Sequence, residues 1–305
     1  MKTSLIMLSA LAISAAACCP KAFEQTQVKK DISVQLYSLR DQIGDPEKYA
    51  ANHEEVFNTL AEYGYTSVEA ACYDGDKGLF YGVAPEQYKK DVEAAGLVSL
   101  SSHVGHWLSD EELASGDFSK SLEWWKKCVE AHKAAGVKYI VYPWMGVPAT
   151  VKELQIFGDY LNAIGKICKD NDIRFGYHNH SHEFSKVEDK EVMLDYLLTH
   201  TDPTLVFFQM DVYWAVWGHV SPVEYFQKYP GRFAMLHIKD KYEIGQSGMV
   251  GFDAIFANAE TAGLRNLVVE IESFDNTGDW KKSMKMCADY LLKAPFVKAS
   301  YAGTK

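Results

Sequence analysis

The sequence has no excess of basic residues. Its 305 residues include 31 Lys and Arg against 41 Asp and Glu, which gives a formal net charge of -10. Phosphate backbones are bound by a basic protein face, so this balance argues against a nucleic acid as partner. It leaves metal binding open, because a metal site needs only a few local carboxylates.

Three further features are missing. No glycine follows the first predicted strand in the run 35–40, which disfavours a dinucleotide-binding fold. After the first residues, no apolar run is long enough to span a bilayer. No CxxC pair occurs in the body of the chain, so a zinc-thiolate site is not expected. The cysteines there are Cys72, Cys128, Cys168 and Cys287.

The N-terminus is predicted to be a targeting segment. Lys2 gives a positive start, Leu5–Ile13 is a short apolar run, and small residues lead to Cys18. Residues 1–19 thus resemble a bacterial lipoprotein signal, with ordinary cleavage after the alanines as the alternative. Residues 20–30 are the predicted tether. We expect an exported protein, periplasmic or lipid-anchored, that meets a membrane only through an N-terminal lipid.

Strand and helix patterns then alternate along the chain. The predicted strands are Ile32–Leu39, Ser67–Ala71, Val98–Ser102, Tyr139–Pro143, Ile173–His178, Leu205–Asp211, Phe233–Lys239 and Leu267–Glu272. The predicted helices are Tyr49–Tyr63, Pro85–Ala95, Phe118–Ala135, Val151–Lys169, Lys190–Thr199, Pro222–Tyr229, Phe252–Ala262 and Trp280–Leu292. Eight such units predict one domain over residues 31–305, an α/β protein with the (β/α)8 TIM barrel fold.

Polar residues end each of the last four predicted strands. These ends are the segments 177–180, 209–211, 237–240 and 270–272, which carry histidines and carboxylates. Active sites of such barrels collect at the C-terminal ends of the strands. Buried charge there is costly unless it is paired or bound to metal. Two histidines and two carboxylates from adjacent strands fit one divalent ion of the Mn, Zn, Co or Mg type.

These motifs resemble those of the xylose-isomerase-like barrel superfamily. That superfamily includes sugar-phosphate isomerases and epimerases, inosose dehydratases, hydroxypyruvate isomerases and AP endonucleases. The segment Val34–Asp41 resembles the first strand of the family, and the segments 177–184, 236–240 and 269–270 resemble three further motifs. The resemblance extends over nearly the whole chain after the targeting segment, and it implies a catalytic barrel domain.

The resemblance also implies metal ligands from strands five to eight. Carried onto this sequence, they are His178, Asp211, His237 and Glu270. Sugar epimerases of the superfamily usually have glutamate in place of His178, and two glutamates there exchange a proton on either side of the substrate carbon. The histidine calls that two-glutamate mechanism into question. The choice between His178 and His180 stays open, as does that between Glu270 and Glu272, with Glu270 preferred.

Other strand-end residues are candidates for catalysis and substrate binding. The predicted catalytic residues are His180, Glu183, Lys239 and Glu270. Lys239 would stabilise an enediolate, with a structural ion pair as the alternative. Glu183 would act as a base or orient His180, with a loop carboxylate as the alternative. The predicted substrate contacts are Glu69, His103, Trp144 and Trp214. The two indoles would stack on the apolar faces of a sugar, with packing for stability as the alternative.

We therefore expect a metal-dependent sugar isomerase or epimerase that abstracts a proton next to a carbonyl and forms an enediolate. A lyase or dehydratase of 3-keto-sugars or keto-glycosides is the alternative, because loss of a β-substituent can follow the same step. A non-catalytic sugar-binding lipoprotein is an alternative of another class, which the ligand set argues against. Acidity disfavours a nuclease. The expected partner is a small-molecule sugar or sugar derivative, and a homo-oligomer stays open.

Overall fold

The computed structural model describes residues 29–303, so the predicted signal peptide and most of the tether lie outside the described residues. Eight parallel strands close into a barrel in the order β1-β12-β11-β10-β7-β6-β5-β2. They are β1 (Ser33–Gln35), β2 (Ser67–Ala70), β5 (Val98–His103), β6 (Tyr139–Tyr142), β7 (Arg174–His178), β10 (Val206–Asp211), β11 (Met235–Lys239) and β12 (Asn266–Glu270). The predicted (β/α)8 TIM barrel is confirmed.

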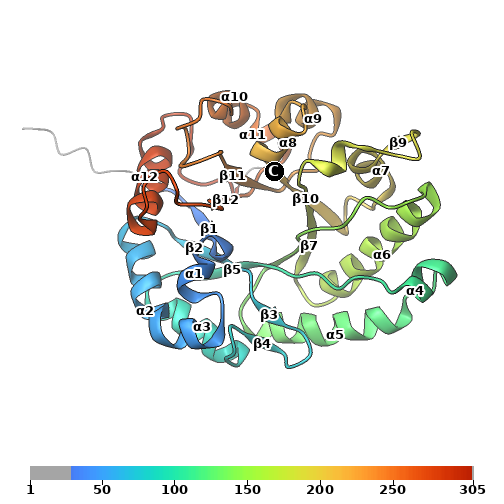
Figure 1. Cartoon of the computed structure of the whole chain (residues 1–305), viewed down its shortest axis with the longest axis horizontal. Helices are drawn as coiled ribbons and strands as arrows, with labels where there is room; N and C mark the ends of the chain where they lie inside the picture. Colours follow the sequence, from blue (N-terminus) through green and yellow to red (C-terminus); the bar gives the residue numbers. More distant parts are fainter. Residues whose placement is uncertain (1–28, 304–305) are drawn as a thin grey trace, which may run out of the picture.

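Helices surround this barrel (Figure 1). The outer helices are α2 (Pro46–Glu62), α3 (Pro85–Ala94), α5 (Ser119–Ala134), α6 (Val151–Lys169), α7 (Met193–His200), α9 (Pro222–Lys228), α10 (Phe252–Ala257), α11 (Ala259–Ala262) and α12 (Trp280–Lys293). Loops after the strands hold η1 (Leu36–Leu39), α1 (Arg40–Ile43), β3 (Tyr73–Asp74), β4 (Leu79–Phe80), α4 (Asp110–Ser115), η2 (His182–Phe184), β8 (Lys186–Val187), β9 (Glu191–Val192) and α8 (Val212–Trp217). Among residues 29–303, no helix has the length and apolarity to cross a membrane.

The predicted elements differ from the structure mainly at their ends. The first predicted strand stops at Gln35, because the Gln35 side chain accepts a hydrogen bond from the backbone N–H of Tyr37 and caps a helical turn. The helix predicted from Lys190 begins only at Met193, after a two-stranded hairpin. The helix predicted over Phe252–Ala262 is divided into α10 and α11 at Asn258. Short apolar runs do not fix such boundaries.

Two layers fill the inside of the barrel. A small apolar cluster that includes Val141, Phe207 and Met235 is almost fully buried. Gly176 makes room for it, because a Cβ at that position would lie 2.5 Å from the Phe207 ring. A second, polar set of buried side chains comes from neighbouring positions on the same strands. Its members include Gln35, Glu69, Ser101, Gln209 and His237. This polar layer forms the base of the candidate site.

Candidate metal centre and substrate cavity

Strand register brings the predicted site residues together. Asp211 on β10 pairs with His237 on β11, and Lys239 on β11 pairs with Glu270 on β12. Parallel strands end at the same face of the barrel, so these side chains meet at its C-terminal mouth, as active-site residues of such barrels do.

Asp211, His237 and Glu270 form a compact, buried group of ligand atoms. One atom from each lies within 4.8 Å of the others. Nδ1 of His237 is 4.0 Å from Oδ2 of Asp211 and 3.5 Å from Oε2 of Glu270. Neither Oδ2 of Asp211 nor Nδ1 of His237 has a hydrogen-bond partner. Buried polar atoms without partners are uncommon, and this nitrogen–oxygen set fits a divalent cation.

The backbone around Asp211 fixes the direction of its carboxylate. Oδ1 accepts the Trp214 backbone N–H at 2.8 Å and caps the start of α8. The other oxygen, Oδ2, has no hydrogen-bond partner and lies 4.0 Å from Nδ1 of His237. Burial raises the pKa of Asp211 to about 7, with Lys239 opposing that rise and Glu270 adding to it. A cation at this point would favour the ionised carboxylate.

Glu69 lies below this group and sets the orientation of His237. Its Oε1 is 2.7 Å from Nε2 of His237 and accepts from Gln35 at 2.8 Å. Its Oε2 accepts from Ser101 at 2.7 Å and from Gln209 at 2.9 Å. Because the Nε2–H of His237 donates to Glu69, Nδ1 faces the other two ligands, and a cation bound there would take the place of its proton. A carboxylate behind a ligating histidine commonly fixes the tautomer in this way.

The carboxylates of Glu69 and Glu270 and the His237 ring stabilise one another in their charged forms. Burial raises the pKa of Glu270, but His237 and Lys239 outweigh it and hold that pKa at about 2. Burial lowers the pKa of His237, but the carboxylates of Glu69 and Glu270 raise it to about 10. The pKa of Glu69 is well below its usual value because His103 and His237 overcome the effect of burial.

A second cluster of possible ligands consists of His103, His178 and His237. Nε2 of His103 is 2.8 Å from Oε1 of Gln209, and Nδ1 of His178 is 3.1 Å from the same oxygen. The structure therefore groups three of the four predicted metal ligands and places His178 beside them. His180 keeps a buried Nδ1 without a partner, and burial lowers its pKa to about 4. His178 thus shares a cluster with His237 but not with Asp211 and Glu270, and His180 belongs to neither cluster.

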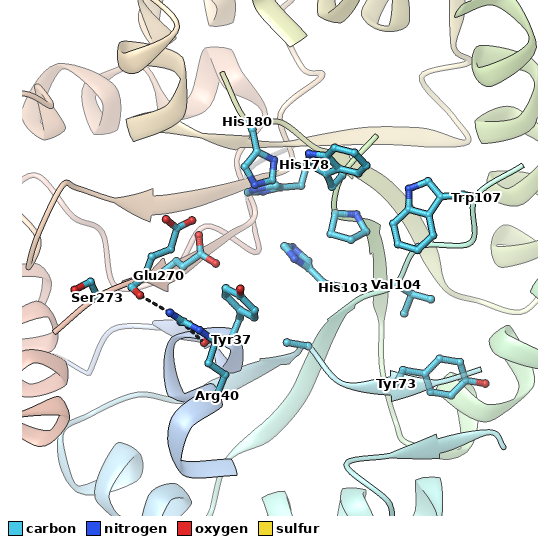
Figure 2. Close-up of a pocket in the computed structure, with 15 residues that line it drawn as sticks. Tyr37, Arg40, Tyr73, His103, Val104, Trp107, His178, His180, Glu270 and Ser273 are labelled. Atoms are coloured by element: carbon cyan, nitrogen blue, oxygen red, sulfur yellow. Dashed lines mark hydrogen bonds between the residues drawn. The ribbon is translucent and has the colours of Figure 1, made fainter. Parts of the chain in front are cut away.

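A cavity of about 800 Å³ opens above these residues. Figure 2 shows His178 and His180 on one side of it, Glu270 on another, and His103 between them. Trp144, a predicted substrate contact, also lines it.

Six predicted site residues lie around this cavity rather than on its lining: Asp211, His237, Lys239, Glu69, Glu183 and Trp214. Glu69 is beneath it and fully buried. Glu183 is behind His180, where it accepts the His180 backbone N–H and the Tyr177 hydroxyl, both at 2.8 Å. Trp214 has its ring 5.7 Å from that of His180. Glu69 contacts the rings of His103 and His237, whereas Glu183 holds only the backbone of His180.

Lys239 lies between two carboxylates at the edge of the site. Its Nζ is 3.9 Å from Oε2 of Glu270 and 3.3 Å from Oε1 of Glu272. It is also 5.6 Å from the centre of the Trp214 ring, within the range of a cation–π contact. Glu270 joins the ligand group, whereas Glu272 pairs with Lys239 and lines the cavity. The structure thus gives the two glutamates different surroundings.

The sequence analysis missed several residues of the site. Gln35 and Gln209 hold the buried base together, and Tyr37, Arg40 and Trp107 line the cavity. A signal existed for Gln209, which lies two residues before Asp211 and therefore on the same face of the strand. For the cavity-lining residues of the loops, strand periodicity offers no signal.

Comparison with known proteins agrees with this geometry. The model of the family described as xylose isomerase-like TIM barrel matches residues 57–290. The chain therefore belongs to this family of enzymes. A solved structure described as a sugar phosphate isomerase/epimerase from Parabacteroides distasonis is 34% identical. It has a TM-score of 0.80, and the alignment covers 91% of this chain and 98% of that one.

Two more distant relatives are informative. An inosose dehydratase from Geobacillus kaustophilus is 24% identical over 203 residues, and the chain spans only 61% of its length. A structure described as the IOLI protein with a binding zinc atom has a TM-score of 0.64 at 13% identity, covering 86% of this chain and 97% of that one. At that identity the likeness shows the fold alone.

Proposed function

We propose that the protein is a metal-dependent sugar isomerase or epimerase. Asp211, His237 and Glu270 would hold the cation, with His178 or His180 as a further ligand. The observation that carries this proposal is the pair of buried ligand atoms without partners, Oδ2 of Asp211 and Nδ1 of His237, beside the Glu270 carboxylate. The related protein described as a sugar phosphate isomerase/epimerase supports the reaction.

The residues around the cavity can move a proton next to a carbonyl. A bound divalent cation supplies Lewis-acid polarisation of substrate oxygens. Glu270 and His180 face the cavity from different walls (Figure 2), so each can exchange a proton with a substrate carbon between them. The Lys239 ammonium group, 3.9 Å from Glu270, stabilises negative charge on an enediolate oxygen. Return of the proton to another carbon or to the other face gives the isomer or epimer.

Elimination is the second candidate, and one observation favours it. The two proton-accepting groups across the cavity are unlike, a carboxylate at Glu270 and an imidazole at His180. Epimerisation uses a matched pair of bases on two faces, whereas elimination needs one group that takes the proton from a carbon and then passes it to the leaving group on the next carbon. The curated relatives named inosose dehydratases support this candidate, which would act on keto-sugars or keto-glycosides.

Proton NMR in deuterated water tests both candidates. The metal-loaded protein is incubated with a panel of ketoses and 3-keto-sugars. An isomerase or epimerase introduces solvent deuterium at a carbon next to the carbonyl and yields an isomer. A lyase yields an unsaturated product that has lost water or an alcohol. Failure to exchange any carbon-bound proton would refute the proposal and favour a sugar-binding protein.

We also propose that the protein is exported, as a periplasmic protein or a lipoprotein. Support comes from the sequence of the N-terminal segment, with Lys2, the apolar run Leu5–Ile13 and Cys18. The intact mass of the mature protein tests this. A mature chain that begins at a diacylated Cys18 or Cys19 indicates the lipoprotein, and a chain that retains Met1 would contradict export.

A further inference from the structure

We propose that the substrate is a keto-glycoside without a phosphate group, whose outer ring or aglycone lies on Trp107 and Trp144. The inference rests on the proposed function, since it places the reacting sugar over the metal ligands. It names the class of substrate, which the reaction alone does not.

The cavity is larger than one sugar ring needs. Its volume is about 800 Å³. Binding sites of about 300 to 1,000 Å³ take drug-sized ligands, and a single hexose is much smaller than those. Figure 2 shows Trp107 across the cavity from Glu270 and Ser273. A sugar at Glu270 therefore leaves room for a second group that reaches toward Trp107.

Trp107 and Trp144 form an exposed aromatic pair at this far side, with ring centres 6.5 Å apart. Their exposed fractions are 54% and 44%, although both line the cavity. Each indole lies against a glycine of its own loop. A Cβ on Gly105 would be 3.4 Å from the Trp107 ring, and one on Gly146 would be 3.6 Å from the Trp144 ring. The indoles thus lie close to the backbone of their own loops while about half of each residue stays exposed, which suits stacking on a sugar or aromatic ring.

The charges around the cavity do not suit a phosphate. Within the described part of the chain, Arg40 is the only Arg or Lys among the lining residues. Its guanidinium group already donates to the carbonyl oxygens of Tyr37 at 3.0 Å and Glu272 at 2.6 Å. The carboxylates of Glu270 and Glu272 line the same cavity and repel an anion. Phosphate is usually recognised by free, bidentate arginines or by a phosphate-binding loop.

Titration calorimetry with matched probes tests the inference. The metal-loaded protein is titrated with methyl and 4-nitrophenyl glycosides of glucose, galactose and mannose, in both anomeric forms, and with the corresponding free sugars and 6-phosphates. We expect at least one nitrophenyl glycoside to bind about 10-fold more tightly than its methyl counterpart, because stacking on the indoles adds affinity. We expect no 6-phosphate to bind more tightly than its free sugar.

Variants assign the preference to the aromatic pair. The double variant Trp107→Ala/Trp144→Ala should lose the roughly 10-fold preference, and Trp107→Phe/Trp144→Phe should keep most of it. Trp217→Ala is the matched control, since Trp217 is 50% exposed but does not line the cavity. The thermal midpoint of each variant verifies folding.

Four results would overturn the inference: equal affinities within every matched pair, a preference that survives the double alanine variant, tighter binding of a 6-phosphate, or binding of no probe. Deuterium exchange distinguishes the two proposals. Exchange without the aromatic preference overturns this inference alone. The preference without exchange on any carbonyl sugar overturns the proposed function and leaves the aromatic subsite in place.

Discussion

Replacing Glu69 by glutamine exchanges one buried carboxylate oxygen for an NH2 group and leaves every proposed metal ligand in place. Both carboxylate oxygens of Glu69 are occupied by donors, from Gln35, Ser101, Gln209 and the ring nitrogens of His103 and His237. The amide of glutamine would direct an N–H at one of these donors and remove the negative charge beside two histidines. The Nε2–H of His237 would then lose the partner that directs Nδ1 toward Asp211 and Glu270.

The expected losses follow from burial. Breaking a buried charge pair costs about 3 to 5 kcal/mol in the free energy of unfolding. At about 2 °C per kcal/mol for a chain of this size, the thermal midpoint falls by about 6 to 10 °C. Loss of a hydrogen-bond partner behind a ligating histidine weakens metal affinity by about 10- to 100-fold.

The assay combines thermal unfolding of the metal-free protein with metal titration against a competing chelator. Glu112→Gln is the matched control, because Glu112 is also a buried carboxylate that accepts from serines, Ser109 and Ser121, and it lies in the first turn of the loop helix α4. It should lower stability without changing metal affinity. A Glu69→Gln protein with wild-type metal affinity and wild-type thermal midpoint would refute the role assigned to this buried base.

Three further outcomes are expected. Lys239→Met removes the ammonium group that would stabilise the enediolate, so it should lower kcat in steady-state kinetics by about 10²- to 10³-fold with unchanged metal content. A normal kcat would show that Lys239 serves only in an ion pair. Burial lowers the pKa of His132 from the ordinary 6.5 to about 4. Between these two pH values the unfolded chain binds a proton at His132 and the folded chain does not, so the free energy of unfolding falls as the pH drops from about 6.5 toward 4. Between pH 7 and pH 5, His132→Gln should lose about 2 kcal/mol less than the wild type in urea unfolding, and equal losses would contradict this. Gly165→Ala should cost about 1 to 3 kcal/mol, because its Cβ would lie 2.6 Å from the Leu205 carbonyl oxygen, whereas Gly158→Ala in the same helix has no atom within 4 Å and should not destabilise.

The barrel could be predicted because its strands and helices follow simple periodicities and alternate eight times. The grouping of Asp211, His237 and Glu270 could be predicted because strand ends converge on one face of a parallel barrel, which makes these residues neighbours without knowledge of the loops. The first strand was too long in the prediction, since a side-chain cap from Gln35 turns an apolar run into a helical turn.

The roles of second-tier residues depend on packing that sequence spacing does not encode. Glu69 was expected to contact substrate, but the structure places its oxygens among five donors beneath the cavity. Glu183 was expected to act as a base or to orient His180, and the structure shows it accepting the His180 backbone N–H from outside the cavity lining. Trp107 was not predicted as a site residue, because it lies in the loop after β5, where neither strand nor helix periodicity applies.

Metal analysis of the purified protein tests the central claim, that strands β10, β11 and β12 deliver their ligands to a single cation. After loading and removal of free metal, we expect about one divalent ion per wild-type chain, and none in Asp211→Ala or His237→Ala. The surface variant Asp289→Asn should bind metal like the wild type, because the ion pairs of Asp289 within residues 29–303 are with Lys285 and Lys293 of its own helix. A wild-type protein that retains no metal, or an Asp211→Ala protein with full occupancy, would contradict the account.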